Sequence, residues 1–234
     1  MSGNHAAEPM LLAAGEPTTV ADAAAALRAG KVVAIPTDTV YGLAAALDRP
    51  DAIARLYALK SRPQDKAIPV LLADTAALEQ VAATVPLSAR ALIDRFWPGG
   101  LTVVIPALAH LPKEVTSAAG DGMRTVAVRI PDHSVARAIL TAAGGAVAVT
   151  SANRSGEQPA VDGRAVLSLG NAAPDVVVDG GPAPLRAPST VVLAVADEIS
   201  VLREGAIPAA AITEALHVAA ERTGEVGPRT PHAV

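Results

Sequence analysis

Cysteine is absent from this chain of 234 residues. Its absence excludes disulfide bonds, thiol catalysis and cysteine-ligated metal centres, and it agrees with the cytoplasmic location that we expect. Aromatic residues make up only 2% of the chain, although 51% of its residues are hydrophobic. The core must therefore be built from Ala, Val, Leu and Ile. No apolar run approaches the roughly 20 residues that a membrane-spanning helix needs, so we expect no membrane segment.

Charged residues are also scarce, at 18% of the chain, and the net charge is -4. An acidic chain of this kind does not coat nucleic acid by bulk electrostatics, although a local basic pocket is compatible with it. Several common catalytic signatures are missing. The sequence has neither a G-x-x-x-x-G-K-[ST] stretch nor a G-x-G-x-x-G fingerprint, and its five histidines lack zinc-binding spacing. An enzyme with this sequence would need another kind of chemistry.

Helical and β-rich segments alternate along most of the chain. We expect helices over residues 18–30, 51–60, 75–82, 87–96, 134–145 and 208–222. We expect strands over residues 31–35, 68–73, 101–106, 125–131, 146–151, 176–181, 189–195 and 199–205. Alternation of this kind predicts an α/β fold, and the consecutive strands near the C-terminus indicate a mixed sheet flanked by helices.

The two ends of the chain lack a clear hydrophobic period. We interpret residues 1–16 as a flexible N-terminal arm and residues 222–234 as a disordered tail. Residues 17–221 contain no internal repeat and no convincing linker, so they are expected to form a single catalytic domain.

The stretch "LYALKSRPQDKAIPVLL", residues 56–72, carries Lys60, Arg62 and Lys66 between two apolar runs. Cations at the end of a helix favourably meet the negative end of its dipole, and a charge run is usually a solvated surface. Against that simple explanation, Pro63 restricts the loop and the following strand is apolar throughout. The loop is thus pinned between buried elements and could direct its cations into one pocket.

Three further polar clusters stand at the ends of predicted strands, where α/β sheets bind their ligands. The stretch "IPTDTVYGL", residues 35–43, supplies hydroxyls, although by itself it is typical of a turn. The stretch "VTSANRSG", residues 149–156, gathers hydroxyl and amide groups on a glycine-containing loop. The third combines "RAPSTVV" with "SVLREG". The polar residues of these clusters are Thr37, Thr39, Tyr41, Thr150, Ser151, Asn153, Ser189, Thr190 and Arg203.

Arg129 lies inside the apolar strand "TVAVRIP", where an inward-pointing guanidinium would need an anionic partner. Together with Lys60, Arg62 and Arg203 it could line one anion-binding pocket. Such a pocket suits phosphates plus a carboxylate, because Arg forms bidentate hydrogen bonds with carboxylates and Lys is a point charge that attracts phosphate. No carboxylate pair or histidine stands out as a general base. Positioning and charge neutralisation, on which phosphoryl and nucleotidyl transfer largely depend, fit better.

In this order, the clusters resemble the threonylcarbamoyl-AMP synthase family, which has a YrdC-like domain. The matching pieces are "GKVVAIPTDTVYGLAA", "LYALKSRPQDKAIPV", "FWPGGLTVVIP", "TVAVRIPDH", "VAVTSANRSG", "VVVDGG", "PSTVV" and "VLREGAI", from about residue 30 to 207. The ordered combination of K-x-R with S-x-N is the specific part of the match. The chain resembles the short form of the family.

This resemblance implies a YrdC-like fold, with a twisted mixed sheet and a large central cationic cavity. It implies a nucleotidyltransferase that joins L-threonine, bicarbonate and ATP into L-threonylcarbamoyl-AMP and releases pyrophosphate. That reaction is the first step of N6-threonylcarbamoyladenosine formation at position 37 of tRNA, and magnesium accompanies the ATP. The expected partners are a downstream tRNA threonylcarbamoyl transferase complex and weakly bound tRNA.

The resemblance also implies roles for individual residues. Lys60 and Arg62 would be catalytic, and the ATP contacts would be Lys60, Arg62, Thr125, Ser151, Asn153 and Arg203. The threonine contacts would be Thr37, Arg129 and Ser189. No side chain is assigned to metal binding. Longer members carry Asn and His where this chain has Lys66 and Leu71, so those two contacts are not carried over.

Two alternatives stay open at this point. An RNA-binding or regulatory paralogue could keep the fold and the cationic pocket without synthase activity, although the acidic net charge counts against it. A non-catalytic α/β domain that binds sugars or nucleotides has less support once the motifs are counted together.

Overall fold

The computed structural model describes residues 8–120, 122–170, 173–195, 198–223 and 232–233. The helices are α1 (Thr19–Arg28), α2 (Pro50–Lys60), η1 (Ala76–Gln80), α3 (Leu87–Phe96), η2 (Lys113–Val115), α4 (Ser134–Ala142), α5 (Gly163–Leu167) and α6 (Ala209–Thr223), of which η1 and η2 are 3₁₀ helices. The strands are β1 (Met10–Ala13), β2 (Val33–Ile35), β3 (Gly42–Ala46), β4 (Val70–Leu72), β5 (Leu101–Pro106), β6 (Thr116–Ala118), β7 (Arg124–Arg129), β8 (Ala146–Ser151), β9 (Val176–Asp179), β10 (Thr190–Val195), β11 (Glu198–Arg203) and β12 (His232–Ala233).

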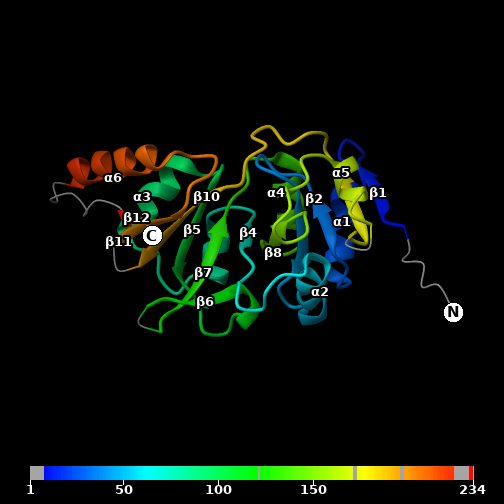
Figure 1. Cartoon of the computed structure of the whole chain (residues 1–234), viewed down its shortest axis with the longest axis horizontal. Coiled ribbons are helices and arrows are strands. Elements are labelled where there is room, and N and C mark those ends of the chain that lie inside the picture. Colours follow the sequence, from blue (N-terminus) through cyan, green and yellow to red (C-terminus); the bar gives the residue numbers. More distant parts are fainter. Residues whose placement is uncertain (1–7, 121, 171–172, 196–197, 224–231, 234) are drawn as a thin grey trace.

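These strands form one long mixed sheet, with helices on both of its faces (Figure 1). Its strand order is β1-β9-β2-β3-β8-β4-β7-β5-β10-β11-β12, and β6 pairs with β7 beside this path. The sheet contains both parallel pairs, such as β4 with β7, and antiparallel pairs, such as β4 with β8. The sheet therefore confirms the predicted twisted, mixed α/β architecture. The extent of the single domain, residues 17–221, stays a prediction.

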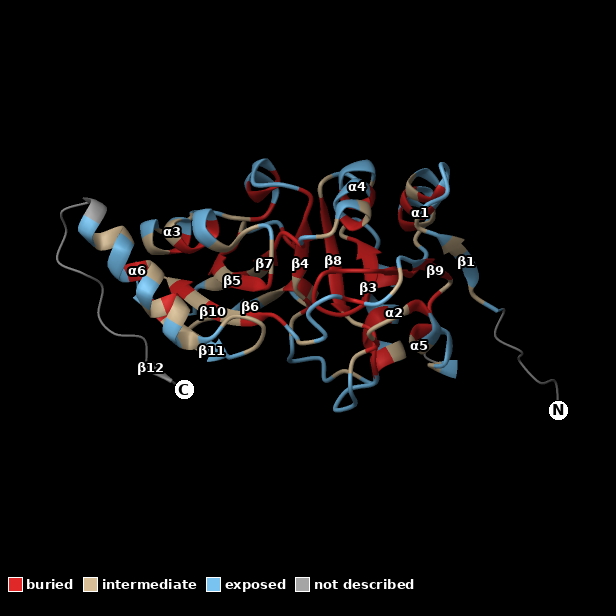
Figure 2. Cartoon of the chain, turned by 90° about the horizontal axis from the view of Figure 1, so that it is seen from above, coloured by how far each residue is buried: buried red, intermediate tan, exposed pale blue. Residues whose placement is uncertain are grey.

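Aliphatic clusters cover the two faces of the sheet (Figure 2). On one face α1 and α4 lie side by side and bury Leu27 and Ile139 against β2, β8 and β9. On the opposite face α2 buries Ile53 and Leu56 in the larger cluster, to which α3 and α6 also contribute. The strands between these layers are short and apolar on both sides, as expected of a sheet covered by helices.

The half of the sheet formed by β7, β5 and β10 is buried unequally on its two faces. The side chains of Val128, Val103 and Val192 point into the larger core. The alternate residues Ala127 and Val104, which oppose each other in the register of β5 and β7, are only half-buried. Because side chains alternate across a strand, Arg129 shares this second face with Ala127. The structure thus leaves one partly open face, and Arg129 stands on it.

The chain ends differ from the sequence-based prediction. Residues 10–13, expected to belong to a flexible arm, form β1, which pairs in parallel with β9 and is tied down by the Thr19 hydroxyl donating to the Ala13 carbonyl at 2.6 Å. At the other end, α6 continues to Thr223 and residues 232–233 pair with β11. The disorder predictions were wrong for these parts, while residues 1–7, 224–231 and 234 lie outside the described residues.

Within the part of the chain that the structure describes, no helix has both the length and the apolar character needed to cross a bilayer.

Candidate active site

Lys60 connects the two most specific motifs of the sequence. It is the last residue of α2, because Ser61 adopts a left-handed backbone conformation (φ 50°) that ends the helix. Its Nζ atom donates to the Ser151 carbonyl at 2.5 Å, to Asn153 Oδ1 at 2.5 Å, to the Asn153 carbonyl at 3.0 Å and to Ser151 Oγ at 3.2 Å. The side chain is buried, with 2% of the residue exposed. Burial, and next the charge of Arg62, lower the pKa of Lys60 from 10.5 to about 8.

The loop after β8 is fixed by its own side chains. Ser151 Oγ donates to Asn153 Oδ1 at 2.7 Å. The amide nitrogen of Asn153 donates to the carbonyls of Arg154 and Glu157, at 2.8 and 2.7 Å. Both polar ends of the asparagine are therefore used inside the loop. The S-x-N segment holds the lysine in place, so the cation reaches the site as a fixed positive charge.

Arg62 organises the loop between α2 and β4. Its Nε donates to the Lys66 carbonyl at 2.9 Å and its Nη2 donates to the Ala67 carbonyl at 2.7 Å. The Tyr57 hydroxyl donates to the same Lys66 carbonyl at 3.1 Å and to the Glu114 carbonyl at 2.8 Å. A guanidinium has five N–H groups, so about three of those on Arg62 stay free for an anion. Burial lowers the pKa of Arg62.

Arg129 has the anionic partner that its place in an apolar strand requires. Its Nη2 donates to Asp38 Oδ1 at 2.5 Å, and both side chains are 7% exposed. Its Nη1 donates to Thr39 Oγ1 at 2.7 Å and its Nε donates to the Gly99 carbonyl at 2.8 Å. Burial lowers the pKa of Arg129, while the nearby Asp38 opposes that shift. In the sequence, Asp38 lies in a stretch that is typical of a turn. Nothing in the sequence signals that this aspartate is buried against an arginine of another strand.

The predicted threonine contacts Thr37 and Ser189 already make hydrogen bonds within the protein. Thr37 Oγ1 donates to the Val40 carbonyl at 2.6 Å and so closes the turn before β3. Ser189 Oγ shares a hydrogen bond of 2.8 Å with Thr102 Oγ1. The Ser189 carbonyl accepts from Arg203 Nη2 at 2.8 Å. The two hydroxyls therefore stand in the site as ordered groups of fixed orientation.

The four predicted cations influence one another electrostatically. Burial is the largest cause of the lowered pKa of Lys60, Arg203 and Arg129. The charge of Arg62 adds to this effect at Lys60 and Arg203, and the charge of Arg203 adds to it at Arg129. We refer to Lys60, Arg62, Arg129 and Arg203 as the cationic cluster. Thr125 lies four residues before Arg129 on β7, on the same face, with its hydroxyl donating to a carbonyl of β6 at 3.2 Å. A large central cavity around the cluster stays a prediction.

The two departures from the longer family pattern fall in different surroundings. Lys66 is exposed, and its backbone carbonyl rather than its ammonium is used in the loop. Leu71 is 5% exposed and belongs to the apolar cluster under α4. In the parallel register of β4 with β7 it pairs with Arg129. The residue beside Arg129 on the neighbouring strand is therefore apolar.

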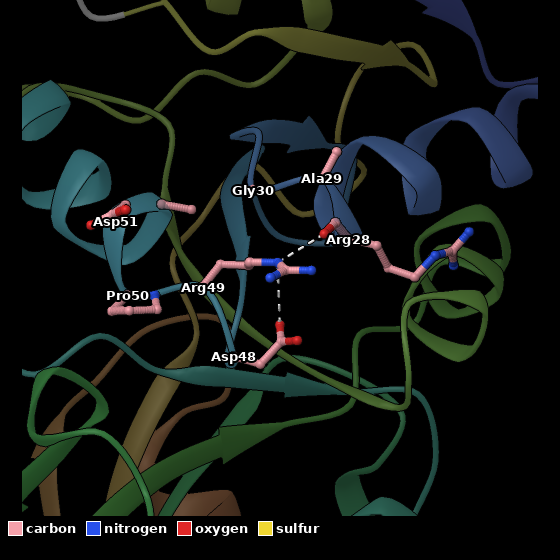
Figure 3. A pocket seen from close by; sticks show the side chains of 8 residues that line it. Arg28, Ala29, Gly30, Asp48, Arg49, Pro50 and Asp51 are labelled. Atoms are coloured by element: carbon pink, nitrogen blue, oxygen red, sulfur yellow. Dashed lines mark hydrogen bonds and ion pairs between the residues drawn. The ribbon is translucent and has the colours of Figure 1, made fainter.

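A surface pocket of about 470 Å³ lies elsewhere, where α1 ends and α2 begins (Figure 3). There the Arg49 Nε donates to the Arg28 carbonyl at 2.8 Å. Lys60 is ten residues further along α2 than Pro50, a rise of roughly 15 Å. The pocket is therefore not part of the cationic cluster.

Comparison with known proteins places this arrangement in a family. A family model named Sua5_yciO_yrdC, with the description "Telomere recombination", matches residues 25–205. The chain belongs to the Sua5/YciO/YrdC family. Over 189 residues it is 40% identical to the threonylcarbamoyl-AMP synthase of Bacillus subtilis (strain 168), a match that covers 80% of this chain and 54% of that protein. It is 42% identical over 144 residues to the threonylcarbamoyl-AMP synthase of Halorhodospira halophila, covering 62% of this chain and 73% of that protein.

Solved structures of the Sua5/YciO/YrdC family share the fold. The Sua5 protein of Pyrococcus abyssi, crystallised in complex with L-threonine, superposes with a TM-score of 0.80 at 30% identity, covering 95% of this chain and 67% of that one. YciO of Escherichia coli superposes with a TM-score of 0.73 at 21% identity, covering 86% of this chain and 96% of that one, and this likeness concerns the fold alone. The chain spans about half the length of the curated relatives from B. subtilis and P. abyssi (54% in each).

Proposed function

We propose that this family member is a threonylcarbamoyl-AMP synthase. In this proposal the protein joins L-threonine, bicarbonate and ATP into L-threonylcarbamoyl-AMP and releases pyrophosphate, which makes it a nucleotidyltransferase. The product would supply a separate tRNA threonylcarbamoyl transferase complex for modification of position 37. The observation that carries the proposal is the meeting of Lys60 with Ser151 and Asn153, beside the other cations of the cluster. The names of relatives at 36–42% identity support it.

The nucleotide side of the site is the cationic cluster with its neighbouring polar groups. Lys60, Arg62 and Arg203 would neutralise the phosphates, with Ser151, Asn153 and Thr125 beside them. Burial strengthens these charges toward a bound anion, because few water molecules screen them. ATP would enter as its magnesium complex. The described residues contain no group of three or more His, Asp or Glu side chains placed to hold a metal ion, so in this proposal magnesium belongs to the substrate and is carried by its phosphates.

The amino-acid side of the site consists of Thr37, Arg129 and Ser189. Arg129 uses three of its five N–H groups within the protein and keeps one free on each terminal nitrogen. Two parallel N–H groups are the donors that a carboxylate prefers. L-threonine is the ligand in the P. abyssi Sua5 crystal structure, and we extend the same substrate to this chain.

Two chemical steps follow from these assignments. The ammonium of threonine first gives up a proton, and the resulting amine attacks the carbon of bicarbonate, which gives a carbamate and water. An oxygen of the carbamate then attacks the α-phosphorus of ATP, and the bond to the β-phosphate oxygen breaks to release pyrophosphate. Lys60 and Arg62 stabilise the negative charge that gathers on the departing pyrophosphate.

Omission of single substrates tests the proposal. The purified protein is incubated with ATP, threonine and bicarbonate, and the rate of pyrophosphate release is measured. We expect release to fall to background when either threonine or bicarbonate is left out. Release that is indifferent to threonine would overturn the proposal.

A further inference from the structure

Asp38 has one carboxylate oxygen for which the protein supplies no donor. Its Oδ1 accepts from Arg129 Nη2 at 2.5 Å and from the backbone N–H of Asp132 at 3.0 Å. Its Oδ2 is buried and has no hydrogen-bond partner, and across the described ranges it is the one buried side-chain nitrogen or oxygen in that position. Only 5% of Asp38 is exposed. Because an unsatisfied buried carboxylate oxygen is destabilising, an acceptor left in this state is suited to an incoming donor.

Neutralising Arg129 does not require this second oxygen. The ion pair is formed through Oδ1. The guanidinium also donates hydrogen bonds to Thr39 Oγ1 and to the Gly99 carbonyl. The pair therefore offers a free anionic acceptor on Asp38 and two free N–H donors on Arg129. Both side chains are shielded from water, so bulk solvent competes little for these groups.

An α-amino acid carries the complementary pair of charges. Its ammonium and its carboxylate are attached to the same carbon, and their charges sum to zero, as do those of Asp38 and Arg129. Binding such a zwitterion brings no net charge into a buried site, which limits the desolvation penalty. A hydroxy acid without the amino group would leave Oδ2 unsatisfied and would add one net negative charge.

We propose that Asp38 is a specificity-determining residue whose Oδ2 accepts a hydrogen bond from the ammonium of the amino-acid substrate while Arg129 binds its carboxylate. The site then selects threonine over the same acid without its amino group. This inference rests on the proposed function, because it names the groups that hold threonine. It assigns to Asp38 a contact with the substrate in addition to its ion pair with Arg129.

The test compares two ligands on two proteins. Asp38→Asn keeps an oxygen for Arg129 but places an amide NH₂ at the position of Oδ2. The NH₂ and the ammonium of the substrate are both hydrogen-bond donors, so the contact between them is lost. Dissociation constants are measured by calorimetry for L-threonine and for (R)-3-hydroxybutyrate, which lacks the amino group. The wild type should bind threonine at least about tenfold more tightly than the hydroxy acid. Asp38→Asn should raise the dissociation constant of threonine by about tenfold or more and that of (R)-3-hydroxybutyrate by less than about threefold.

Equal weakening of both ligands would overturn the proposal, because it would mean that Asp38 only keeps Arg129 in place. Asp132→Asn is the matched control, since it makes the same change on the exposed neighbouring carboxylate, and it should alter neither constant. If Asp38→Asn does not fold, the wild type decides, and equal affinity for the two ligands overturns the proposal. These are binding measurements without turnover, so a protein that shows the selectivity but forms no product overturns the proposed function alone.

Discussion

The Nζ atom of Lys60 has four oxygen acceptors within 3.2 Å but only three protons to donate. Burial disfavours its charged form and the surrounding oxygens favour it, so the lysine is a fixed and costly charge. Removing the charge of Lys60 also removes the free-energy cost of burying it, which offsets part of the lost hydrogen bonds, whereas a substrate anion has no substitute for the charge. Stability and activity should therefore respond differently to changes at this residue.

Lys60→Met tests that separation. The thioether keeps the length of the side chain but removes the charge from the phosphate site, so kcat/KM for ATP should fall by about 100-fold or more. The free energy of unfolding should change by less than about 3 kcal/mol, because the lost hydrogen bonds are offset by removal of a buried charge. Pyrophosphate release and urea denaturation measure the two quantities. Lys66→Met, the same change on an exposed lysine, should retain most of the activity, and an equal loss there would argue against a specific role for Lys60.

The lowered pKa of Lys60 makes both ATP affinity and stability depend on pH. In the folded protein the lysine loses its proton near pH 8, whereas in the unfolded chain it keeps it until about 10.5. Between these values the unfolded state binds more protons, so the contribution of Lys60 to stability rises with pH through this window. Affinity for ATP should fall over the same range, because the neutral amine no longer attracts phosphate. Measurements of ATP affinity from pH 7 to 9.5 check this. In Lys60→Met the affinity for ATP should depend less on pH than in the wild type.

At the scale of elements, backbone segments approach each other closely around the site. A Cβ atom on Gly205 would lie 2.3 Å from the Pro188 carbonyl oxygen and 2.6 Å from the Ser189 carbonyl oxygen. This glycine lets the turn after β11 pack against the start of β10, where Arg203 meets Ser189. The position of the arginine thus depends on a glycine two residues later.

Gly205→Ala should destabilise the protein by about 1–3 kcal/mol, because the added methyl group forces the two backbone segments apart. Affinity for ATP should fall as well, since Arg203 would lose its contacts with the Ser189 carbonyl. Thermal denaturation and ATP titration measure these effects. Gly15→Ala is the control, because nothing lies within 4 Å of its added Cβ atom. A Gly205→Ala protein as stable as the control would contradict this account of the turn.

Sequence patterns predicted the longer elements and missed those that only tertiary contacts specify. The β-branched run over residues 101–106 indicates a strand by itself, and β5 has these bounds. The segment Gly42–Ala46 is mostly alanine and becomes β3 only because β2 and β8 pair with it on either side. Lys60 and Arg62 could be singled out as site candidates because they stand out as charges between apolar runs. Asp38 was not, because a turn aspartate carries no sign in the sequence that it will be buried against Arg129.

At the scale of the whole molecule, the sheet order brings distant motifs together. The motifs of residues 60–62 and 151–153 are about 90 positions apart in the sequence, yet β4 and β8 are neighbouring strands, and each of these motifs adjoins one of the two. The cationic cluster is therefore assembled locally on a chain whose net charge is -4. This combination suits a pocket for a small anion better than a surface for nucleic acid.

Binding of tRNA should accordingly be weak. Fluorescence anisotropy with a tRNA at 50 and 200 mM salt should show low affinity and only a modest loss of affinity between the two conditions, because few phosphate contacts are available. Tight binding with a steep salt dependence, together with no adenylate product, would favour the RNA-binding or regulatory alternative.

We propose that this protein builds a carbamate on threonine before it transfers the adenylyl group. Mass spectrometry of the reaction with ¹³C-bicarbonate tests it most directly, because the labelled carbon must appear in the nucleotide product. We expect threonylcarbamoyl-AMP that is heavier by one mass unit than the product formed from unlabelled bicarbonate. A threonine-dependent nucleotide product without the label would contradict it, since that product would arise by direct adenylation of the amino acid.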